Sequence, residues 1–255
     1  MKKHLKLASW NLACGAGPEY RCCQLEQIIT VLKEENPDII LLQEIDKNIA
    51  RSGNRDIPFL LGQALQLEAF FAPAIKPLED GKGSIAPDNE SGFGNAVLSR
   101  HGFTEMRNIP LGPGPGGEGE QEHRSAAYVQ IDLGGIVVQV FSTHLVQSFG
   151  APSPIRVAQV AALCHALHPG LPLIGGGDFN INVNCGDLQA LASITSLLTP
   201  GLGPTCSLAK NDRFIFAIDH LFGRDITPER AVKKAFPDLS DHCMVTLEFS
   251  VNSSQ

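Results

Sequence analysis

The feature that most constrains this chain is the alternation of short strand-like runs with helical patterns along its whole length. Residues 39–42 are the wholly apolar Ile-Ile-Leu-Leu, which is typical of a strand buried on both faces. They follow a segment in which Leu25, Ile28, Ile29 and Leu32 have helical spacing. This alternation continues without a linker or repeat. It predicts one α/β domain over residues 1–255, built on two packed sheets flanked by helices.

The predicted elements follow from periodicity and from turn residues. Strands are predicted at residues 4–11, 39–42, 69–74, 95–99, 126–133, 136–142, 171–174, 214–222, 231–234 and 243–250. Helices are predicted at residues 25–32, 58–67, 154–168 and 188–197. Residues 78–94 are predicted to be a polar loop. Residues 111–121, rich in glycine and proline, are predicted to be a mobile loop that connects strands or shapes a substrate pocket.

Composition narrows the class of protein. With 255 residues, 43% of them hydrophobic and 18% charged, the chain can bury a large core, which excludes a disordered tail. No apolar run approaches the roughly 20 residues of a membrane-spanning helix. Seven cysteines without Cys-x-x-Cys spacing indicate neither a disulfide framework nor a zinc knuckle. We therefore expect a cytoplasmic protein with reduced, mostly buried cysteines.

Net charge bears on the partner. Twenty Lys and Arg stand against 27 Asp and Glu, a balance of −7. This gives no global basic field for nucleic acid or anionic lipid, so nucleic acid is weakened as a partner without being removed. An acidic excess also fits a site with several metal-binding carboxylates.

Polar residues able to bind metal or move protons recur where the predicted strands end. Taken singly, each is more often a solvated or hydrogen-bonded side chain, but strand ends bring distant residues together. The set consists of Asn11, Glu44, His144, Asp178, Asn180, Asp219, His220, Asp241 and His242.

The order of these residues and their neighbours forms a recognisable series. Its segments are Trp10-Asn11, Leu42-Gln43-Glu44, residues 94–100, residues 142–145, residues 177–180, Ile218-Asp219-His220 and Ser240-Asp241-His242. The series resembles the endonuclease/exonuclease/phosphatase superfamily, which includes deoxyribonuclease I, AP endonucleases, bacterial sphingomyelinases and inositol polyphosphate phosphatases. Four further features look like a bacterial metal-dependent hydrolase branch related to lipid-remodelling members: residues 51–54, the Gly-rich segment before Glu122-His123-Arg124, Arg156 and Gln159.

The resemblance implies a four-layer α/β sandwich with two packed mixed sheets, and a divalent cation that assists hydrolysis of phosphate esters. The cation is expected to be Mg²⁺, with Mn²⁺ as a substitute, held by Glu44, Asn11 and Asp241. These side chains suit the preference of a hard ion for oxygen ligands. The cation would stabilise negative charge on the phosphoryl oxygens.

The resemblance also implies roles for the remaining residues. Asp178 is expected to orient the attacking water, and His242 to act as base or phosphate-binding partner, with its ring oriented by Asp219. Which of Asp178 and His242 takes the proton stays open. His144 and Asn180 are expected to stabilise the transition state, and Arg124 to bind the phosphate.

Two observations refine these expectations. His220 follows Asp219 on a strand and therefore faces the opposite way, which indicates a structural role. Asn11-Leu12-Ala13-Cys14 lacks the Asp that AP endonucleases usually carry in this motif, and His144 stands in the region where they use tyrosine. Both differences disfavour abasic-site repair.

The leading hypothesis is a Mg²⁺-dependent phosphodiesterase whose substrate is a small molecule or lipid headgroup, without a membrane span and with no obligate protein partner inferred. The alternative is a DNA or RNA endonuclease or exonuclease of the same superfamily. A remote alternative is a catalytically inactive binding module, because fold alone does not fix function.

Overall fold

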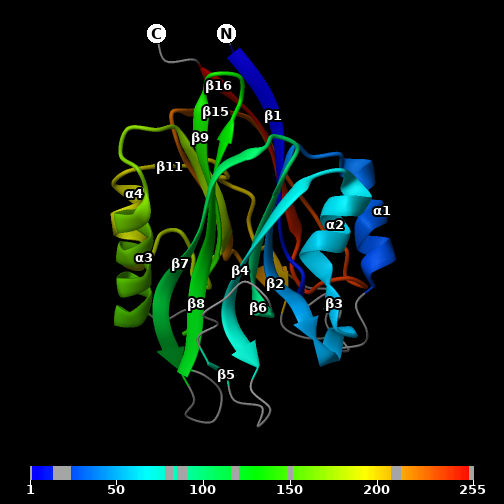
Figure 1. Cartoon of the computed structure of the whole chain (residues 1–255). Coiled ribbons are helices and arrows are strands. Elements are labelled where there is room, and N and C mark those ends of the chain that lie inside the picture. Colours follow the sequence, from blue (N-terminus) through cyan, green and yellow to red (C-terminus); the bar gives the residue numbers. More distant parts are fainter. Residues whose placement is uncertain are drawn as a thin grey trace.

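The computed structural model describes residues 2–13, 24–77, 83–84, 91–115, 121–148, 152–207 and 214–252 (Figure 1). An eight-stranded sheet has the order β15-β16-β1-β2-β6-β4-β5, with β3 paired to β2. Its strands are β1 (Lys2–Asn11), β2 (Ile39–Ile49), β3 (Arg55–Asp56), β4 (Glu68–Pro77), β5 (Gly83–Ser84), β6 (Gly92–Ser99), β15 (Ile226–Lys234) and β16 (Met244–Asn252).

A six-stranded sheet has the order β11-β14-β10-β9-β8-β7. Its strands are β7 (Phe103–Pro115), β8 (Gln121–Asp132), β9 (Val137–His144), β10 (Leu173–Asp178), β11 (Ser196–Leu197) and β14 (Asp219–Arg224). The small strands β12 (Cys206–Ser207) and β13 (Phe214–Phe216) pair separately. The α-helices are α1 (Leu25–Glu35), α2 (Ile57–Leu65), α3 (Pro154–Ala166) and α4 (Gln189–Ala192), with 3-10 turns at Ala50–Ser52 and Gly186–Leu188.

Three apolar cores separate four layers. The first joins the facing sides of the two large sheets, the second lies between the eight-stranded sheet and α1 and α2, and the third lies between the six-stranded sheet and α3 and α4. Figure 1 shows these helix pairs on opposite outer sides of the molecule. Both large sheets mix parallel and antiparallel pairs. The expected four-layer α/β sandwich is therefore confirmed. Separately, none of the described helices is both long and apolar enough to cross a membrane.

The apolar run at residues 39–42 explains why two cores meet at β2. Ile39 and Leu41 face the core between the sheets, whereas Ile40 and Leu42 face the core under the helices. Successive residues of a strand face opposite sides, so a strand buried between two cores needs an apolar residue at every position. The prediction that this strand ends at residue 42 is wrong, because β2 continues to Ile49.

The continuation of β2 passes through an irregularity. Its pairing with β6 shifts register between Leu42 and Ile45, and Glu44 has a positive φ of 52°. A β-bulge of this kind re-aims a side chain within a strand. Glu44 therefore projects from an interruption inside β2 and not from the end of the strand.

Strand β10 also extends beyond its prediction at residues 171–174, because it runs through three glycines to Asp178. A Cβ added at Gly175 would lie 2.2 Å from the Phe141 ring, and one at Gly177 would lie 2.1 Å from the Thr143 carbonyl oxygen. Glycine therefore allows the neighbouring strand β9 to approach closely.

The glycine- and proline-rich segment is partly a strand. β7 continues through Pro115 and pairs with β8 from Gln121, so the prediction of a loop over residues 111–121 is wrong for its ends. β7 lies at the edge of its sheet, where proline is tolerated because one side of the strand needs no hydrogen-bond donors. Residues 116–120 lie outside the described residues, as does most of the predicted loop at residues 78–94.

Two further predictions are wrong in extent. The helix expected at residues 188–197 is only the short α4, and Ser196–Leu197 is strand β11. The strand expected at residues 214–222 is two strands, β13 and β14. The described cysteines are free thiols, as expected: Cys164, Cys185, Cys206 and Cys243.

Candidate active site

Three polar side chains lie at one level of the six-stranded sheet. Asp178 ends β10, and the register places it beside His144 at the end of parallel β9 and beside Asp219 at the start of antiparallel β14. The three residues are buried. Ordinary strand pairing therefore brings together residues that are up to 75 positions apart in the sequence, the separation between 144 and 219.

The eight-stranded sheet brings two more residues to the same place. Asn11 ends β1, where it pairs with Gln43, and Glu44 follows at the bulge. Asn11 Nδ2 donates to Glu44 Oε1 at 3.2 Å and to Asp178 Oδ2 at 3.1 Å. Asn11 thus links the carboxylates of the two sheets.

His144 and Asn180 also lie beside the Asp178 carboxylate. The Asn180 backbone N–H donates to Asp178 Oδ1 at 2.8 Å, while Asn180 Nδ2 donates to the Leu145 carbonyl and lies 2.9 Å from His144 Nε2. Burial, followed by the charges of Arg124 and His242, lowers the pKa of His144 well below its usual value, so its ring is neutral. A neutral ring that accepts from Asn180 at Nε2 carries its proton on Nδ1, which lies 3.7 Å from Glu44 Oε1.

His242 joins the two sheets from the segment before β16. Its Nδ1 lies 2.9 Å from Asp219 Oδ2, which also accepts a hydrogen bond from Thr205 Oγ1 at 2.6 Å. Its Nε2 lies 3.7 Å from Asp178 Oδ2. The ring is therefore held between a carboxylate on each side.

These carboxylates shift the pKa of both groups. Burial lowers the pKa of His242, but the charge of Asp219 and the hydrogen bond to it outweigh burial and raise the pKa well above its usual value. Burial raises the pKa of Asp178 to about 7, against the lowering effect of His242 and with a further increase from Asp219. His242 therefore carries a proton at neutral pH, while Asp178 can gain or lose one.

The backbone around His242 is fixed by polar contacts. The Trp10 indole Nε1 donates to the His242 carbonyl at 3.1 Å. Ser240 Oγ donates to the Asn11 carbonyl at 2.6 Å and accepts from the His242 backbone N–H at 3.0 Å. The end of β1 and the segment carrying His242 are thereby held together.

Arg124 and Asp241 lie at the margin of this arrangement. Arg124, on β8, is buried, and its charge lowers the pKa of both Glu44 and His144. Asp241 is half-buried and acts in the opposite sense on Glu44, whose pKa is raised chiefly by burial. Hereafter the polar cluster means Asp178 and the six residues around it: Asn11, Glu44, His144, Asn180, Asp219 and His242.

The sequence also singled out His220, which the structure places elsewhere. Its Nε2 lies 2.9 Å from the Ile181 carbonyl, and its ring stands near those of Phe179 and Phe222. Burial lowers its pKa. It faces away from Asp219, as the strand alternation predicts.

The chemistry of the oxygen donors fits a divalent cation. Glu44 offers a half-buried carboxylate and Asp241 a second one. Asn11 turns its amide nitrogen toward Glu44, while its amide oxygen accepts from the Ala13 N–H at 3.0 Å, so its side chain would have to rotate to add an oxygen ligand. Asp241 Oδ1 is buried and accepts no hydrogen bond from the part of the chain that the structure describes. Glu44 also groups with His144 and Asp178, since one ligand atom from each lies within 4.8 Å of the others. Such oxygen-rich surroundings suit Mg²⁺ or Mn²⁺.

Sequence reasoning missed two supporting residues. Thr205 fixes Asp219, but it stands after a Gly-Pro turn with no periodic pattern to mark it. Arg156 was noticed only as part of the finer resemblance, yet it is fully buried in α3. It donates to Asp187 Oδ2 at 2.9 Å and to the carbonyls of Val146 at 2.9 Å and Asn180 at 3.3 Å. No signal in the sequence marks this role, because an arginine on a helix is usually exposed.

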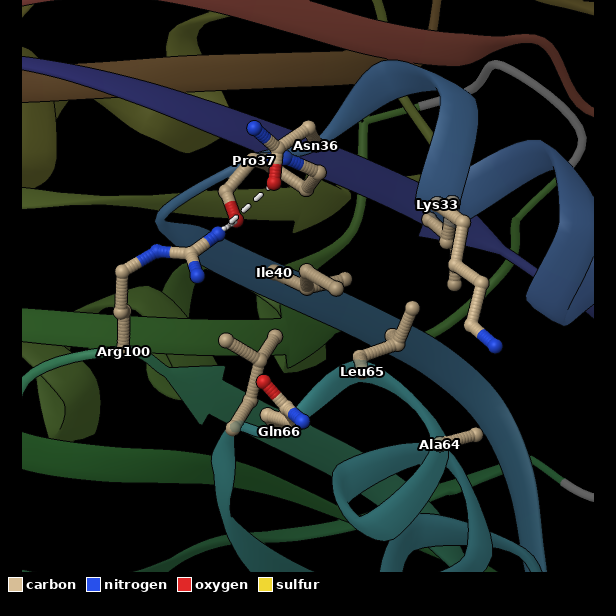
Figure 2. A pocket seen from close by; sticks show the side chains of 10 residues that line it. Lys33, Asn36, Pro37, Ile40, Ala64, Leu65, Gln66 and Arg100 are labelled. Carbon is tan, nitrogen blue, oxygen red and sulfur yellow. Dashed lines mark hydrogen bonds between the residues drawn. The ribbon is translucent and has the colours of Figure 1, made fainter.

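A separate pocket of about 310 Å³ lies between the ends of α1 and α2. Figure 2 shows Arg100 at its rim with its guanidinium turned toward Asn36. Arg100 Nη2 donates to Asn36 Oδ1 at 2.9 Å, and Arg100 Nε donates to Asp38 Oδ1 at 3.2 Å. Within the described residues its lining includes no member of the polar cluster.

Comparison with solved structures places this geometry in a known fold. An endonuclease/exonuclease/phosphatase from Beutenbergia cavernae matches with a TM-score of 0.79 at 21% identity, over 98% of this chain and 72% of that one. A counterpart from Bacteroides vulgatus matches with a TM-score of 0.72 at 14% identity, over 98% of this chain and 100% of the other. D. rerio TDP2 complexed with single strand DNA product matches with a TM-score of 0.67 at 15% identity, over 97% and 99% of the two chains.

Sequence comparison gives the family directly. No curated protein sequence matches the chain at a significant level. The sequence model of the endonuclease/exonuclease/phosphatase family matches residues 8–242, which span the polar cluster from Asn11 to His242. Members of this superfamily are metal-dependent hydrolases of phosphate esters. The chain belongs to the endonuclease/exonuclease/phosphatase family.

Proposed function

We propose that this protein is a Mg²⁺-dependent phosphodiesterase that cleaves its substrate by direct attack of water. The observation that carries the proposal is the chain of contacts from Glu44 through Asn11 and Asp178 to His242, which joins oxygen donors on one sheet to proton-handling groups on the other. Both sheets contribute to one site, which supports treating residues 1–255 as a single domain.

Glu44, Asn11 and Asp241 would hold the cation. When bound, it supplies Lewis-acid stabilisation of the negative charge that builds on phosphoryl oxygens. Arg124 is the buried guanidinium whose charge reaches Glu44 and His144, and it is suited to bind a phosphate oxygen.

Asp178 and His242 form the proton-handling pair. His242 holds protons on both ring nitrogens, because Asp219 stabilises its charged form through Nδ1. Asp178 Oδ2 is therefore the acceptor for the proton of the attacking water, and the His242 Nε2–H lies beside it as a donor. His144 Nδ1–H is a further donor for charge that develops in the transition state, and Asn180 supports it by donating to His144 Nε2.

The substrate we favour is a small-molecule or lipid-headgroup phosphodiester in the cytoplasm. The net charge of −7 supports a grip on one phosphate more than on many. The structure adds an observation that the sequence did not give: Ile215 and Phe216 on β13 are exposed, 45% and 39% respectively. β13 pairs with β12, which directly follows Thr205, so an apolar part of the substrate would find a surface beside the site.

The test is hydrolysis of a substrate panel with and without EDTA: sphingomyelin, phosphoinositides, simple aryl phosphodiesters, RNA and plasmid DNA. We expect metal-dependent cleavage of a lipid or small phosphodiester, with loss of turnover in Asp178→Asn, which excludes a contaminating enzyme. Efficient plasmid cleavage would favour the nuclease instead if the logarithm of the apparent DNA affinity falls with the logarithm of the salt concentration with a slope steeper than about −4. Such a slope indicates several phosphate contacts. Absence of turnover on every substrate would contradict the proposal that this protein is a phosphodiesterase.

A further inference from the structure

Beside the oxygen donors lies a second group of metal-ligating side chains with a different chemistry. One ligand atom each from Cys206, Asp241 and His242 lies within 4.8 Å of the other two. A thiol with an imidazole and a carboxylate is a donor set for zinc, whereas the Glu44 and Asn11 side adds only oxygen donors. Cys206 has no part in the hydrolysis proposed above.

The backbone holds these residues in place. Cys206 and His242 form an antiparallel bridge, so their side chains leave the backbone on the same face. The Ser207 N–H donates to the Asp241 carbonyl at 3.0 Å, and the Cys243 N–H donates to the Thr205 carbonyl at 2.7 Å. The spacing of the three ligands therefore does not depend on a loose loop.

The distances are close to what a tetrahedral ion needs. Zinc bonds of about 2.0 to 2.3 Å to N, O and S place neighbouring ligand atoms about 3.4 to 3.6 Å apart. The present separations, at most 4.8 Å, require side-chain movements of little more than about 1 Å. Three protein ligands would leave a fourth position for water.

The donors are also available for an ion. Cys206 and His242 are 8% and 6% exposed. Among the described residues, the Cys206 thiol bonds the Ser207 carbonyl at 3.4 Å and contacts the His242 ring. Asp241 Oδ1 is buried and accepts no hydrogen bond from the described residues. Ion binding would satisfy this oxygen and release two protons to solvent, one from the Cys206 thiol and one from the charged His242 ring.

We propose that Cys206, Asp241 and His242 form an inhibitory site for Zn²⁺ or a similar thiophilic cation. Two of its ligands belong to the machinery proposed above, so the ion would take His242 from Asp178 and Asp241 from the activating cation. The binding part of this inference stands without the proposed function, and the inhibitory part rests on it. Mg²⁺ would then activate hydrolysis, and Zn²⁺ would inhibit it.

The first test measures binding alone. The full chain is titrated with Co²⁺, to observe the near-ultraviolet thiolate-to-cobalt absorption, and with Zn²⁺ in competition with a chromophoric chelator. We expect one thiolate-bound ion per chain, and at least a tenfold weaker Zn²⁺ affinity in Cys206→Ser, given that even indirect changes at metal sites cost about 10- to 100-fold. Cys164→Ser, which changes a half-buried thiol on α3, is the matched control and should bind like the wild type.

The second test measures inhibition. With Mg²⁺ saturating, added Zn²⁺ should inhibit the wild type and Cys164→Ser, whereas Cys206→Ser should need at least about tenfold more Zn²⁺. Cys206→Ala, checked by thermal unfolding, serves if the serine variant folds poorly. Equal Zn²⁺ affinity in wild type and Cys206→Ser overturns the site. Thiolate binding without inhibition overturns the inhibitory role. A protein that binds Zn²⁺ through Cys206 but hydrolyses nothing contradicts the proposed function and leaves the metal site established.

Discussion

The two sheets contribute to the polar cluster in different ways. In the six-stranded sheet, His144, Asp178 and Asp219 stand in one row because three regular strands end or begin at the same level. In the eight-stranded sheet, Glu44 reaches the cluster from a bulge with a positive φ. The first side chains are buried, whereas the Glu44 side chain is 27% exposed. Regular pairing holds the groups that we propose handle protons, and an irregularity exposes the Glu44 carboxylate that we propose binds the metal.

Each half is supported by its own arginine and aspartate. Fully buried Arg156 bonds Asp187 behind the loops that follow β9 and β10. In the other half, Arg51, whose side chain is 54% exposed, forms two hydrogen bonds to Asp46 at 2.8 Å and 2.7 Å, two residues beyond Glu44. If the two halves have the separate roles proposed here, changes in them should have different signatures.

The largest effect is expected in the proton-handling half. Asp178→Asn and His242→Ala should each lower kcat by about 10² to 10⁴, because one removes the acceptor and the other the charged donor beside it. The loss in the double variant should be far smaller than the product of the two single losses, since the pair acts as one unit. Steady-state kinetics at saturating Mg²⁺ measures all three.

The control is Asp238→Asn, which changes an exposed carboxylate three residues before Asp241 and should leave kcat unaltered. If the losses in Asp178→Asn and His242→Ala multiply, the two residues serve separate steps. The assignment of proton handling to one sheet and metal binding to the other would then be wrong.

The same difference explains what sequence could predict. Asp178 and His144 come just after predicted strands, so their place at strand ends was visible. The interleaving of elements predicted two packed sheets flanked by helices, and the family resemblance implied the four layers. The bulge at Glu44 was not visible, because nothing in Leu42-Gln43-Glu44 separates a strand that ends from one that is re-aimed and continues. The extension of β10 through Gly175 was missed because glycine usually weakens a strand, whereas here close packing against Phe141 requires it.

The next effect concerns stability and the buried support of the six-stranded half. Arg156→Met should lower the free energy of unfolding by about 3 to 5 kcal/mol, because it leaves the buried Asp187 carboxylate with the Ser153 N–H but without its charged partner. Urea unfolding measures the change. Arg230→Met on the exposed face of β15 should shift stability by less than about 0.5 kcal/mol. Equal effects in the two variants would remove Arg156 as the support of this half.

A smaller change in rate is expected in the metal-binding half. Glu44→Gln keeps the shape of the side chain but removes its charge, so it should raise the half-saturating Mg²⁺ concentration by about 10- to 100-fold. Turnover at saturating metal should recover most of its value, unlike that of Asp178→Asn. Glu34→Gln, on the exposed face of α1, is the matched control. An unchanged metal requirement in Glu44→Gln would assign the cation to other ligands.

The smallest effect lies in the eight-stranded half away from the site. Glu35, at the end of α1, bonds Lys6 Nζ at 3.0 Å and also pairs with Lys234. Burial alone would raise the Glu35 pKa, but the bonds and charges of Lys234 and Lys6 outweigh it and lower the pKa below 4.5. Because the folded-state pKa is the lower one, this link stabilises the fold above pH 4.5, and that stability is lost as the pH falls through the folded-state value.

Glu35→Gln should therefore lower the free energy of unfolding by about 1 kcal/mol at neutral pH, a value reduced from that of a buried pair because both lysines are partly exposed. Urea unfolding of wild type and variant, from neutral pH to the acid side of pH 4.5, should show the two curves converging as Glu35 becomes protonated. A difference that stays constant with pH would mean that shape, not charge, joins α1 to the sheet. Since the bond partners of Glu35 are Lys6, five residues before Asn11 on β1, and Lys234 on β15, the Mg²⁺ requirement of Glu35→Gln should equal that of the wild type. A stability change without a metal effect would separate the scaffold of this sheet from the oxygen donors it carries.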